Sequence, residues 1–272
     1  MPTDSLRVLQ YGLGPIGQAV ARTVLEKEPL TLVGAVDIDP DKAGRDVADL
    51  VDGEASSTGV HVSDDAESAL ADTAPDVVLH TTTSFLEGVT EQLVQCVRAG
   101  AHVVSSTEEL SFPHHRSPDT ADRLDQVARA EGVALVGTGV NPGYAMDTVP
   151  LMATAGCTDV RAVHVERVVD AGERREPLQA KVGAGLSPQA FDAKKEGGGF
   201  GHIGLCESLR LVADELGWPV EDITEKLRPV RADGPVDTGV RQVAAGQVAG
   251  IHHTAVGQVG GESRLSLDLK MY

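Results

Sequence analysis

A glycine-rich turn near the start of the chain constrains the possible fold more than any other feature. The run Gly12-Leu13-Gly14-Pro15-Ile16-Gly17 follows a predicted strand at residues 6–11 and opens a predicted helix at residues 16–26. In this G-x-G-x-x-G pattern the first glycine allows a tight turn, the second lets a pyrophosphate approach the backbone, and the third lets the helix pack on the strand. Pro15 suits the first helical turn, where no backbone donor is lost. The pattern predicts a dinucleotide site that includes the three glycines, Pro15 and Ile16.

A carboxylate stands where such a site needs one. The predicted strand at residues 30–36 is followed by Asp37, twenty residues beyond Gly17. A carboxylate at this place can accept hydrogen bonds from both ribose hydroxyls of the dinucleotide. It would repel a 2′-phosphate, and Ile38 and Asp39 supply no cation to offset that repulsion. We therefore expect NAD as the cofactor, with NADP as the less favoured alternative.

The first half of the chain alternates short apolar runs with amphipathic stretches. Besides the two strands already described, strands are predicted at residues 76–80, 101–105 and 133–137, with helices between them. Strands that alternate with helices are typical of a parallel sheet covered on both faces. We predict an α/β fold with a doubly wound parallel Rossmann sheet, in a dinucleotide-binding domain over residues 1–150.

The second half has a different pattern. Long alternating segments at residues 160–169, 243–258 and 264–271 favour antiparallel strands with one covered face, and an amphipathic helix is predicted at residues 202–216. These elements predict an α+β substrate and dimerisation domain over residues 151–272, built on a mainly antiparallel sheet. Its last strand ends without an evident partner or closing helix, which leaves open a truncation at the C-terminus.

Charge and hydropathy exclude several classes of function. The net charge of −18 opposes contact with nucleic acid or membrane, because both need Lys and Arg to replace counterions. No run of about 18 apolar residues suggests a membrane span. A strand that begins at Leu6 leaves no room for a signal peptide, so we expect a cytoplasmic protein. The Asp-rich, Lys-poor composition indicates either the acidic proteome of a salt-adapted organism or simple acidic solubility.

The cysteines and histidines do not form a metal-binding pattern. Cys96, Cys157 and Cys206 are odd in number and far apart, which suits neither a disulfide framework nor a metal-ligand spacing. No cluster of His, Cys, Asp and Glu has the spacing of a known metal site. We predict no metal, and we expect the cysteines to be small apolar residues in a reducing compartment.

Small and hydroxylated residues follow several of the predicted parallel strands. In an open parallel sheet, ligands bind beyond the carboxyl ends of the strands. Residues of this kind can bind a cofactor there while keeping the backbone close to it, although ordinary turn chemistry is the alternative. The candidates for cofactor binding are Thr81, Thr82, Thr83, Ser106, Asn141 and Pro142.

Glu108 is the candidate catalytic residue. It lies just beyond a predicted buried strand, where sugar dehydrogenases of similar build carry Glu-Lys-Pro, but no lysine follows it here. A carbonyl substrate usually needs a cation near its oxygen, whereas an iminium is already positive and is better matched by a carboxylate. An amine must also lose a proton before hydride can leave, and Glu108 could act as that base. Glu109, the next residue on an extended backbone, is expected to point away into solvent.

Four runs of residues together resemble the 2,4-diaminopentanoate dehydrogenase and native amine dehydrogenase family, within the wider dihydrodipicolinate-reductase-like group. The resemblance follows the chain in order over nearly its whole length. The runs are Ser106-Thr107-Glu108-Glu109-Leu110, Gly137-Thr138-Gly139-Val140-Asn141-Pro142-Gly143-Tyr144-Ala145-Met146-Asp147, Lys181-Val182-Gly183-Ala184-Gly185-Leu186 and Gly201-His202-Ile203-Gly204-Leu205-Cys206-Glu207-Ser208.

This resemblance implies an activity. It implies NAD(P)-dependent oxidative deamination of an amine or diamino acid to a ketone, or the reverse reaction with ammonia, in a homodimer with Glu108 as the acid-base residue. Tyr144 and His202 are the weaker candidates for substrate contact. Two alternatives stay open: an imine or carbonyl reductase like dihydrodipicolinate reductase, and a dinucleotide-binding protein without catalysis.

Overall fold

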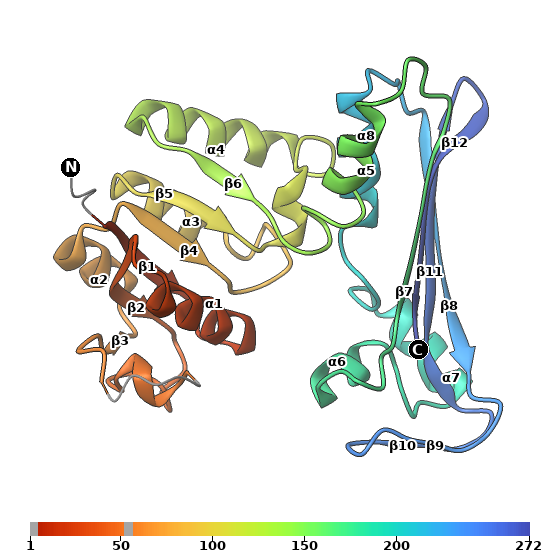
Figure 1. Ribbon diagram of the computed structural model, residues 1–272, viewed down its shortest axis with the longest axis horizontal. Coiled ribbons are helices and arrows are strands. Elements are labelled where there is room, and N and C mark those ends of the chain that lie inside the picture. The colour runs from red at the N-terminus through yellow and green to blue at the C-terminus, as the bar shows by residue number, and fades with distance from the viewer. Residues whose placement is uncertain (1–4, 52–56) are drawn as a thin grey trace. The chain divides into compact units, whose positions relative to one another are not determined.

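The computed structural model describes residues 5–51 and 57–272. It forms two compact units, Met1–Gly139 and Val140–Tyr272, whose elements are labelled in Figure 1. The division falls earlier in the chain than the boundary at residue 150 that the sequence suggested. None of the helices in the described residues has the length and apolar character that a membrane crossing requires.

The first unit is built on a six-stranded sheet in the order β3-β2-β1-β4-β5-β6, and all of its strand pairs are parallel. This arrangement confirms the predicted doubly wound parallel sheet. The strands are β1 (Leu6–Tyr11), β2 (Leu30–Val36), β3 (Val62–Ser63), β4 (Val77–His80), β5 (His102–Ser105) and β6 (Leu135–Gly137).

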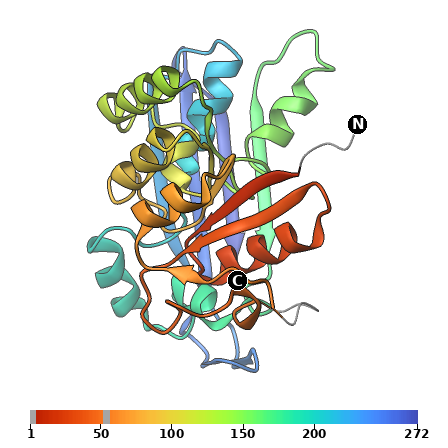
Figure 2. The same cartoon turned by 90° about the vertical axis from the view of Figure 1, so that its left-hand side faces the viewer.

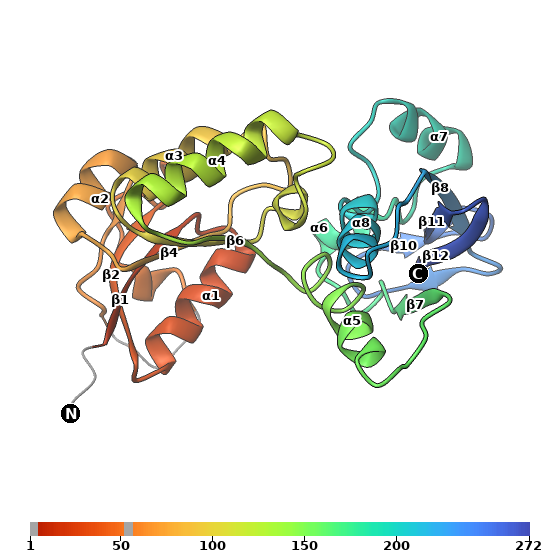
Figure 3. The ribbon, with the colours of Figure 1, turned by 90° about the horizontal axis from the view of Figure 1, so that it is seen from above.

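Helices cover both faces of this sheet, as Figures 2 and 3 show. On one face, α1 packs with the short 3-10 helix η1 over apolar side chains of β1 and β2. On the other, α2, α3 and α4 pack over a core that includes Leu9, Val78 and Val103. The helices are α1 (Pro15–Glu26), η1 (Val47–Asp49), α2 (Ala66–Thr73), α3 (Thr90–Arg98), η2 (Glu108–Ser111) and α4 (Pro118–Glu131).

The carboxyl ends of four strands are aligned. Tyr11 pairs with Val36 on one side and with His80 on the other, and His80 pairs in turn with Ser105. The residues that follow these strand ends therefore leave the sheet at one edge, and this is the edge where parallel α/β sheets bind their ligands.

The second unit is an α+β unit on a mixed four-stranded sheet in the order β7-β12-β11-β8. β11 is antiparallel to both β12 and β8, while β12 is parallel to β7. The sheet thus confirms the predicted α+β character of the second half. The strands of the unit are β7 (Val163–Val169), β8 (Asp222–Arg231), β9 (Val236–Asp237), β10 (Gln242–Val243), β11 (Val248–Val259) and β12 (Glu262–Met271), with β9 and β10 forming a separate pair.

One face of this sheet carries the core of the second unit. Leu209 and Val212 of α8 pack there against Leu267 and Leu269 of β12. α8 begins three residues later than the sequence predicted, because Gly204 adopts a φ of 101°, which is outside the helical region. The helices are α5 (Thr148–Thr154), α6 (Glu176–Lys181), α7 (Pro188–Glu196) and α8 (Leu205–Glu215).

Candidate functional site

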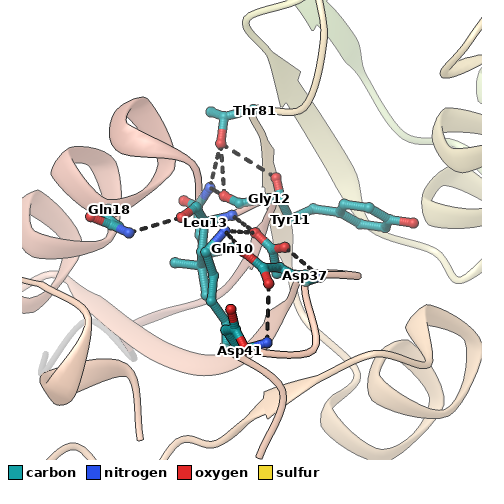
Figure 4. A network of polar contacts seen from close by, with 10 residues as sticks. Gln10, Tyr11, Gly12, Leu13, Gln18, Asp37, Asp41 and Thr81 are labelled. Carbon is teal, nitrogen blue, oxygen red and sulfur yellow. Dashed lines mark hydrogen bonds and ion pairs between the residues drawn. The ribbon is translucent and has the colours of Figure 1, made fainter. Parts of the chain in front are cut away.

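The glycine turn after β1 is held by the loop after β4 (Figure 4). Gly12 has a φ of +87°, and a Cβ at this position would lie 2.6 Å from the carbonyl oxygen of Thr81. The Thr81 hydroxyl donates a 3.0 Å hydrogen bond to the Gly12 carbonyl and accepts one of 2.8 Å from Gln10 Nε2. Thr81 was predicted as a cofactor ligand. Its hydroxyl fixes the turn, and its contact with a cofactor stays a prediction.

The other two glycines of the motif differ in their surroundings. A Cβ on Gly17 would lie 1.9 Å from the Gly12 carbonyl oxygen, so the helix approaches the turn as closely as backbone atoms allow. A Cβ on Gly14 would meet nothing within 4 Å. Gly14 is also the N-cap of α1, and no side chain of the described residues caps it. Open space before a helix N-terminus fits a pyrophosphate, because the helix dipole and the first N–H groups favour an anion there.

The Asp37 carboxylate faces the same turn. Its Oδ2 accepts a hydrogen bond of 2.6 Å from the Leu13 N–H, and its Oδ1 accepts one of 2.9 Å from the Asp39 N–H. Its Oδ2 also lies 3.2 Å from Lys42 Nζ. Only 11% of the Asp37 side chain is exposed. Asp37 thus lies beside the glycine turn, and Lys42 is a nearby cation that was not predicted, because only Ile38 and Asp39 were considered as sources of positive charge.

A buried polar chain lies beneath the strand-end loops. His80 Nδ1 is 2.9 Å from Ser105 Oγ, and its Nε2 is 2.9 Å from Gln92 Oε1 and 3.2 Å from the Thr82 hydroxyl. Ser105 Oγ in turn donates to the Thr107 hydroxyl at 3.1 Å. Burial lowers the pKa of His80, which favours the neutral ring. These hydrogen bonds join the ends of β4 and β5 and support Thr107, the residue that precedes Glu108; they were not predicted from the sequence.

Glu108 and Glu109 have different surroundings. Within residues 5–51 and 57–272, no hydrogen bond or ion pair is recorded for the partly buried Glu108 carboxylate. Glu109 Oε2 accepts a 2.8 Å hydrogen bond from the Leu86 N–H, and Oε1 lies 3.8 Å from Arg116 Nε. The Glu109 side chain is 13% exposed, so the expectation that it is solvated is wrong. The two residues start a 3-10 helix, where side chains do not alternate between opposite sides as they do in a strand.

A second polar group lies within the second unit. Asn141 Nδ2 donates a 2.9 Å hydrogen bond to His202 Nε2. Burial, with a smaller effect from the positive charge of Lys181, lowers the pKa of His202 to about 3. His202 is therefore a neutral hydrogen-bond acceptor near neutral pH. His253 is buried nearby, and its Nδ1 has no hydrogen-bond partner within the described residues.

The turn that carries Asn141 is anchored to α8. The buried Asp147 carboxylate accepts 2.7 Å hydrogen bonds from the Gly143 N–H and from the Ser208 hydroxyl. A Cβ on Gly204 would lie 2.5 Å from the Pro142 ring. These contacts fix the backbone around the peptide bond between Asn141 and Pro142, which is cis.

The predicted site residues divide between the two units. Asn141, Pro142, Tyr144 and His202 belong to the second unit, where Tyr144 is 57% exposed. The Thr83 and Ser106 hydroxyls have no hydrogen bond recorded among the described residues, and Ile16 is 55% exposed at the start of α1. The first unit holds Gly12, Gly14, Pro15, Ile16, Gly17, Asp37, Thr81, Thr82, Thr83, Ser106 and Glu108.

Comparison with protein families gives a match for each part of the chain. Residues 6–138 match the model of the dihydrodipicolinate reductase N-terminus. Residues 144–270 match the model of the 2,4-diaminopentanoate dehydrogenase C-terminal domain. A 2,4-diaminopentanoate dehydrogenase from Acetoanaerobium sticklandii is 28% identical over 267 residues, which are 97% of this chain and 75% of that protein. The chain is thus similar over nearly its whole length to 2,4-diaminopentanoate dehydrogenase.

Two further similar proteins are named amine dehydrogenases. An amine dehydrogenase from Streptomyces virginiae is 25% identical over 264 residues, covering 95% of this chain and 72% of that protein. The solved amine dehydrogenase from Mycobacterium smegmatis is 26% identical and superimposes with a TM-score of 0.82, covering 98% of this chain and 78% of that one. The family resemblance predicted from the four motif runs is thus confirmed.

Within residues 5–51 and 57–272, no group of three or more His, Cys, Asp or Glu side chains is placed to hold a metal ion.

Proposed function

We propose that this chain is an NAD(P)-dependent amine dehydrogenase that converts an amine or diamino acid into a ketone. The reaction is R₂CH–NH₃⁺ + NAD⁺ + H₂O → R₂C=O + NH₄⁺ + NADH + H⁺, and it can run in reverse with ammonia. One structural observation supports the proposal in addition to the similarity to known amine dehydrogenases. At the edge where parallel sheets bind ligands, the Glu108 carboxylate has no hydrogen-bond or ion-pair partner among the described residues. The neighbouring Glu109 carboxylate, in contrast, binds the Leu86 N–H and Arg116.

The dinucleotide is proposed to bind at this edge of the first unit. The pyrophosphate would lie over Gly14 at the start of α1, and the adenosine ribose would bind Asp37. Thr82, Thr83 and Ser106 would line the remainder of the site, while Thr81 holds the turn from below. When bound, the nicotinamide supplies the hydride acceptor. NAD is the proposed main cofactor because a carboxylate disfavours a 2′-phosphate.

Glu108 is proposed to move the protons. It takes a proton from the substrate ammonium, so that the nitrogen lone pair can assist loss of hydride from carbon. Glu108 then releases this proton to solvent, and its carboxylate stabilises the iminium that has formed. The same carboxylate next accepts a proton from the water that attacks the iminium carbon. Ammonia then leaves, and the ketone remains.

Asn141, Pro142, Tyr144 and His202 keep the roles that were predicted from the sequence. Asn141 and Pro142 are proposed cofactor contacts, and Tyr144 and His202 are proposed substrate contacts. His202 would act as a neutral hydrogen-bonding group, because its low pKa and its bond from Asn141 are unsuited to a proton carrier.

The expected result for this function is consumption of NADH with a simple ketone only when ammonia is added. The C–N bond can form only if ammonia condenses with the ketone before reduction. Absorbance at the nicotinamide band measures the rate. Loss of NADH without ammonia would instead support a carbonyl reductase, which the family match of the first unit alone would also allow. No turnover despite NADH binding would support a protein that only binds dinucleotides.

A homodimer is proposed through the open face of the second sheet. One row across this face runs Glu166, Asp268, Thr254 and Lys226, from an acidic edge, whose two carboxylates also contact Lys270, to a basic edge. A two-fold axis along the strands would set the acidic edge of one copy against the basic edge of the other, as an isologous interface requires. A hollow of about 380 Å³ at the basic edge, lined in part by Lys226 and Arg228, has room for side chains of the second copy.

Charge reversal is expected to separate this dimer. The double variant Lys226→Glu, Arg228→Glu should sediment as a monomer. Its new glutamates would face the acidic edge of the second copy, and the like charges would repel each other. Lys27→Glu, the same change on an exposed residue of the first unit, should remain a dimer. A monomeric wild-type protein in analytical ultracentrifugation, or a double variant that stays dimeric, would contradict this interface.

A cytoplasmic setting is also proposed. Cys96 is buried and Cys157 is exposed, and neither is in a disulfide. Burial raises the pKa of the Cys96 thiol to about 12, so it is unreactive near neutral pH. Thiols of this kind suit a reducing compartment, and cell fractionation would test the assignment.

A further inference from the structure

Lys42 lies in the turn that follows β2, and its ammonium group forms ion pairs with two carboxylates. Its Nζ lies 3.2 Å from Asp37 Oδ2 and 3.1 Å from Asp39 Oδ2. The turn that presents it is closed by hydrogen bonds from the Lys42 and Ala43 N–H groups to the Asp39 carbonyl. The Lys42 side chain is only 20% exposed, so this contact is not a loose surface pair.

Asp37 does not depend on Lys42 to stay in place. Two backbone N–H groups, those of Leu13 and Asp39, donate to its two oxygens. Among residues 5–51 and 57–272, the ion-pair partners of Lys42 are these two carboxylates. A lysine has a flexible four-carbon stem and three donors that can be redirected, so Lys42 could turn to a new anion while Asp37 remains held.

This arrangement changes what the ribose end of the cofactor site can accept. A lone carboxylate accepts ribose hydroxyls and repels a phosphate, whereas a carboxylate with a movable ammonium beside it can accommodate either. We propose that Lys42 determines the use of NADP by this enzyme. With NAD it stays on Asp37 and Asp39; with NADP it turns to the 2′-phosphate and supplies the positive charge that Asp37 lacks. The inference rests on the proposed binding of the adenosine ribose at Asp37.

Kinetics with the two cofactors test the proposal. Lys42→Met keeps the apolar stem and removes the charge, and it should lower kcat/KM for NADP by about 10–100-fold, the range for losing a charge-assisted hydrogen bond. The same variant should change kcat/KM for NAD by less than about 3-fold, as expected for loss of a screened ion pair. Asp39→Asn removes a carboxylate that would compete with the 2′-phosphate for the Lys42 ammonium group, and it should raise kcat/KM for NADP.

Arg45→Met is the matched control. Arg45 is a cation of the same segment, but its guanidinium binds the Asp49 carbonyl at 3.0 Å. Its loss should leave the ratio of NADP to NAD efficiency at the wild-type value. A wild-type enzyme that does not use NADP, or a Lys42→Met variant that loses both cofactors equally, would overturn the proposal.

Binding of cofactor fragments separates failure of this inference from failure of the proposed function. Titration calorimetry with adenosine 5′-monophosphate and adenosine 2′,5′-bisphosphate needs no turnover. Lys42→Met should weaken binding of the bisphosphate selectively. If neither fragment binds the wild-type protein, the dinucleotide site itself is wrong. If both bind and Lys42→Met affects them equally, only the role of Lys42 is wrong.

Discussion

Replacing Glu108 with glutamine is expected to lower kcat for amine oxidation by about 10²–10⁴-fold, the usual contribution of a general acid-base group. The amide keeps the size and hydrogen-bonding reach of the side chain but cannot take a proton from the substrate ammonium. Binding of NADH, followed by its fluorescence, should stay within about 2-fold of wild type, because no proton is transferred on binding. The combination of lost turnover and retained cofactor affinity is the signature of a proton-transfer role.

The neighbouring residue offers a control with the same chemical change. Glu109→Gln loses the ion pair with Arg116 but can still accept the hydrogen bond from the Leu86 N–H through its amide oxygen. It should therefore cost stability by about 1 kcal/mol and activity by only a few-fold. If Glu108→Gln keeps wild-type turnover, or if Glu109→Gln is the more damaging change, the assignment of the acid-base residue is wrong.

The first unit was predictable because its determinants are local. The glycine turn and the strand that precedes it lie within a dozen residues, and Asp37 follows at the end of the next strand. Contacts between residues that come together only when the chain folds could not be predicted from the sequence. Lys42 reaches Asp37 through a turn whose shape is set by backbone hydrogen bonds. His80 and Gln92 are brought together only when α3 packs on the sheet.

The second unit shows a different limit. β8 was not predicted, because Asp222–Arg231 has a weak alternation of apolar and polar residues and contains Pro229. β8 is the edge strand of its sheet, where proline is tolerated. Its position opposite Ala255 carries the charged and exposed Glu225, whose carboxylate lies 3.8 Å from His253 Nε2. A charged residue opposite the buried Ala255 breaks the apolar pattern from which a strand is recognised.

The glycines of the motif provide a test that separates folding from cofactor binding. Gly17→Ala would place a Cβ 1.9 Å from the Gly12 carbonyl oxygen, a backbone atom that can move only with the whole turn. We expect a loss of stability of about 3 kcal/mol, at the upper end of the usual cost of overpacking. Thermal unfolding should record this as a drop of several degrees, and NADH binding should be lost with the displaced turn.

Gly14→Ala should have the opposite profile. The new methyl group meets no protein atom within 4 Å, and the φ of −63° at this position suits alanine. Its stability should therefore stay within about 0.5 kcal/mol of wild type, as should that of the control Gly156→Ala, which also has open space around its Cα. Affinity for NADH should fall by about 10-fold or more in Gly14→Ala alone, because the methyl group occupies the place where the pyrophosphate must approach the backbone. A Gly14→Ala protein with wild-type NADH affinity would show that the open space over α1 is not where the cofactor binds, and the positions proposed for Asp37 and Lys42 relative to the ribose would lose their basis.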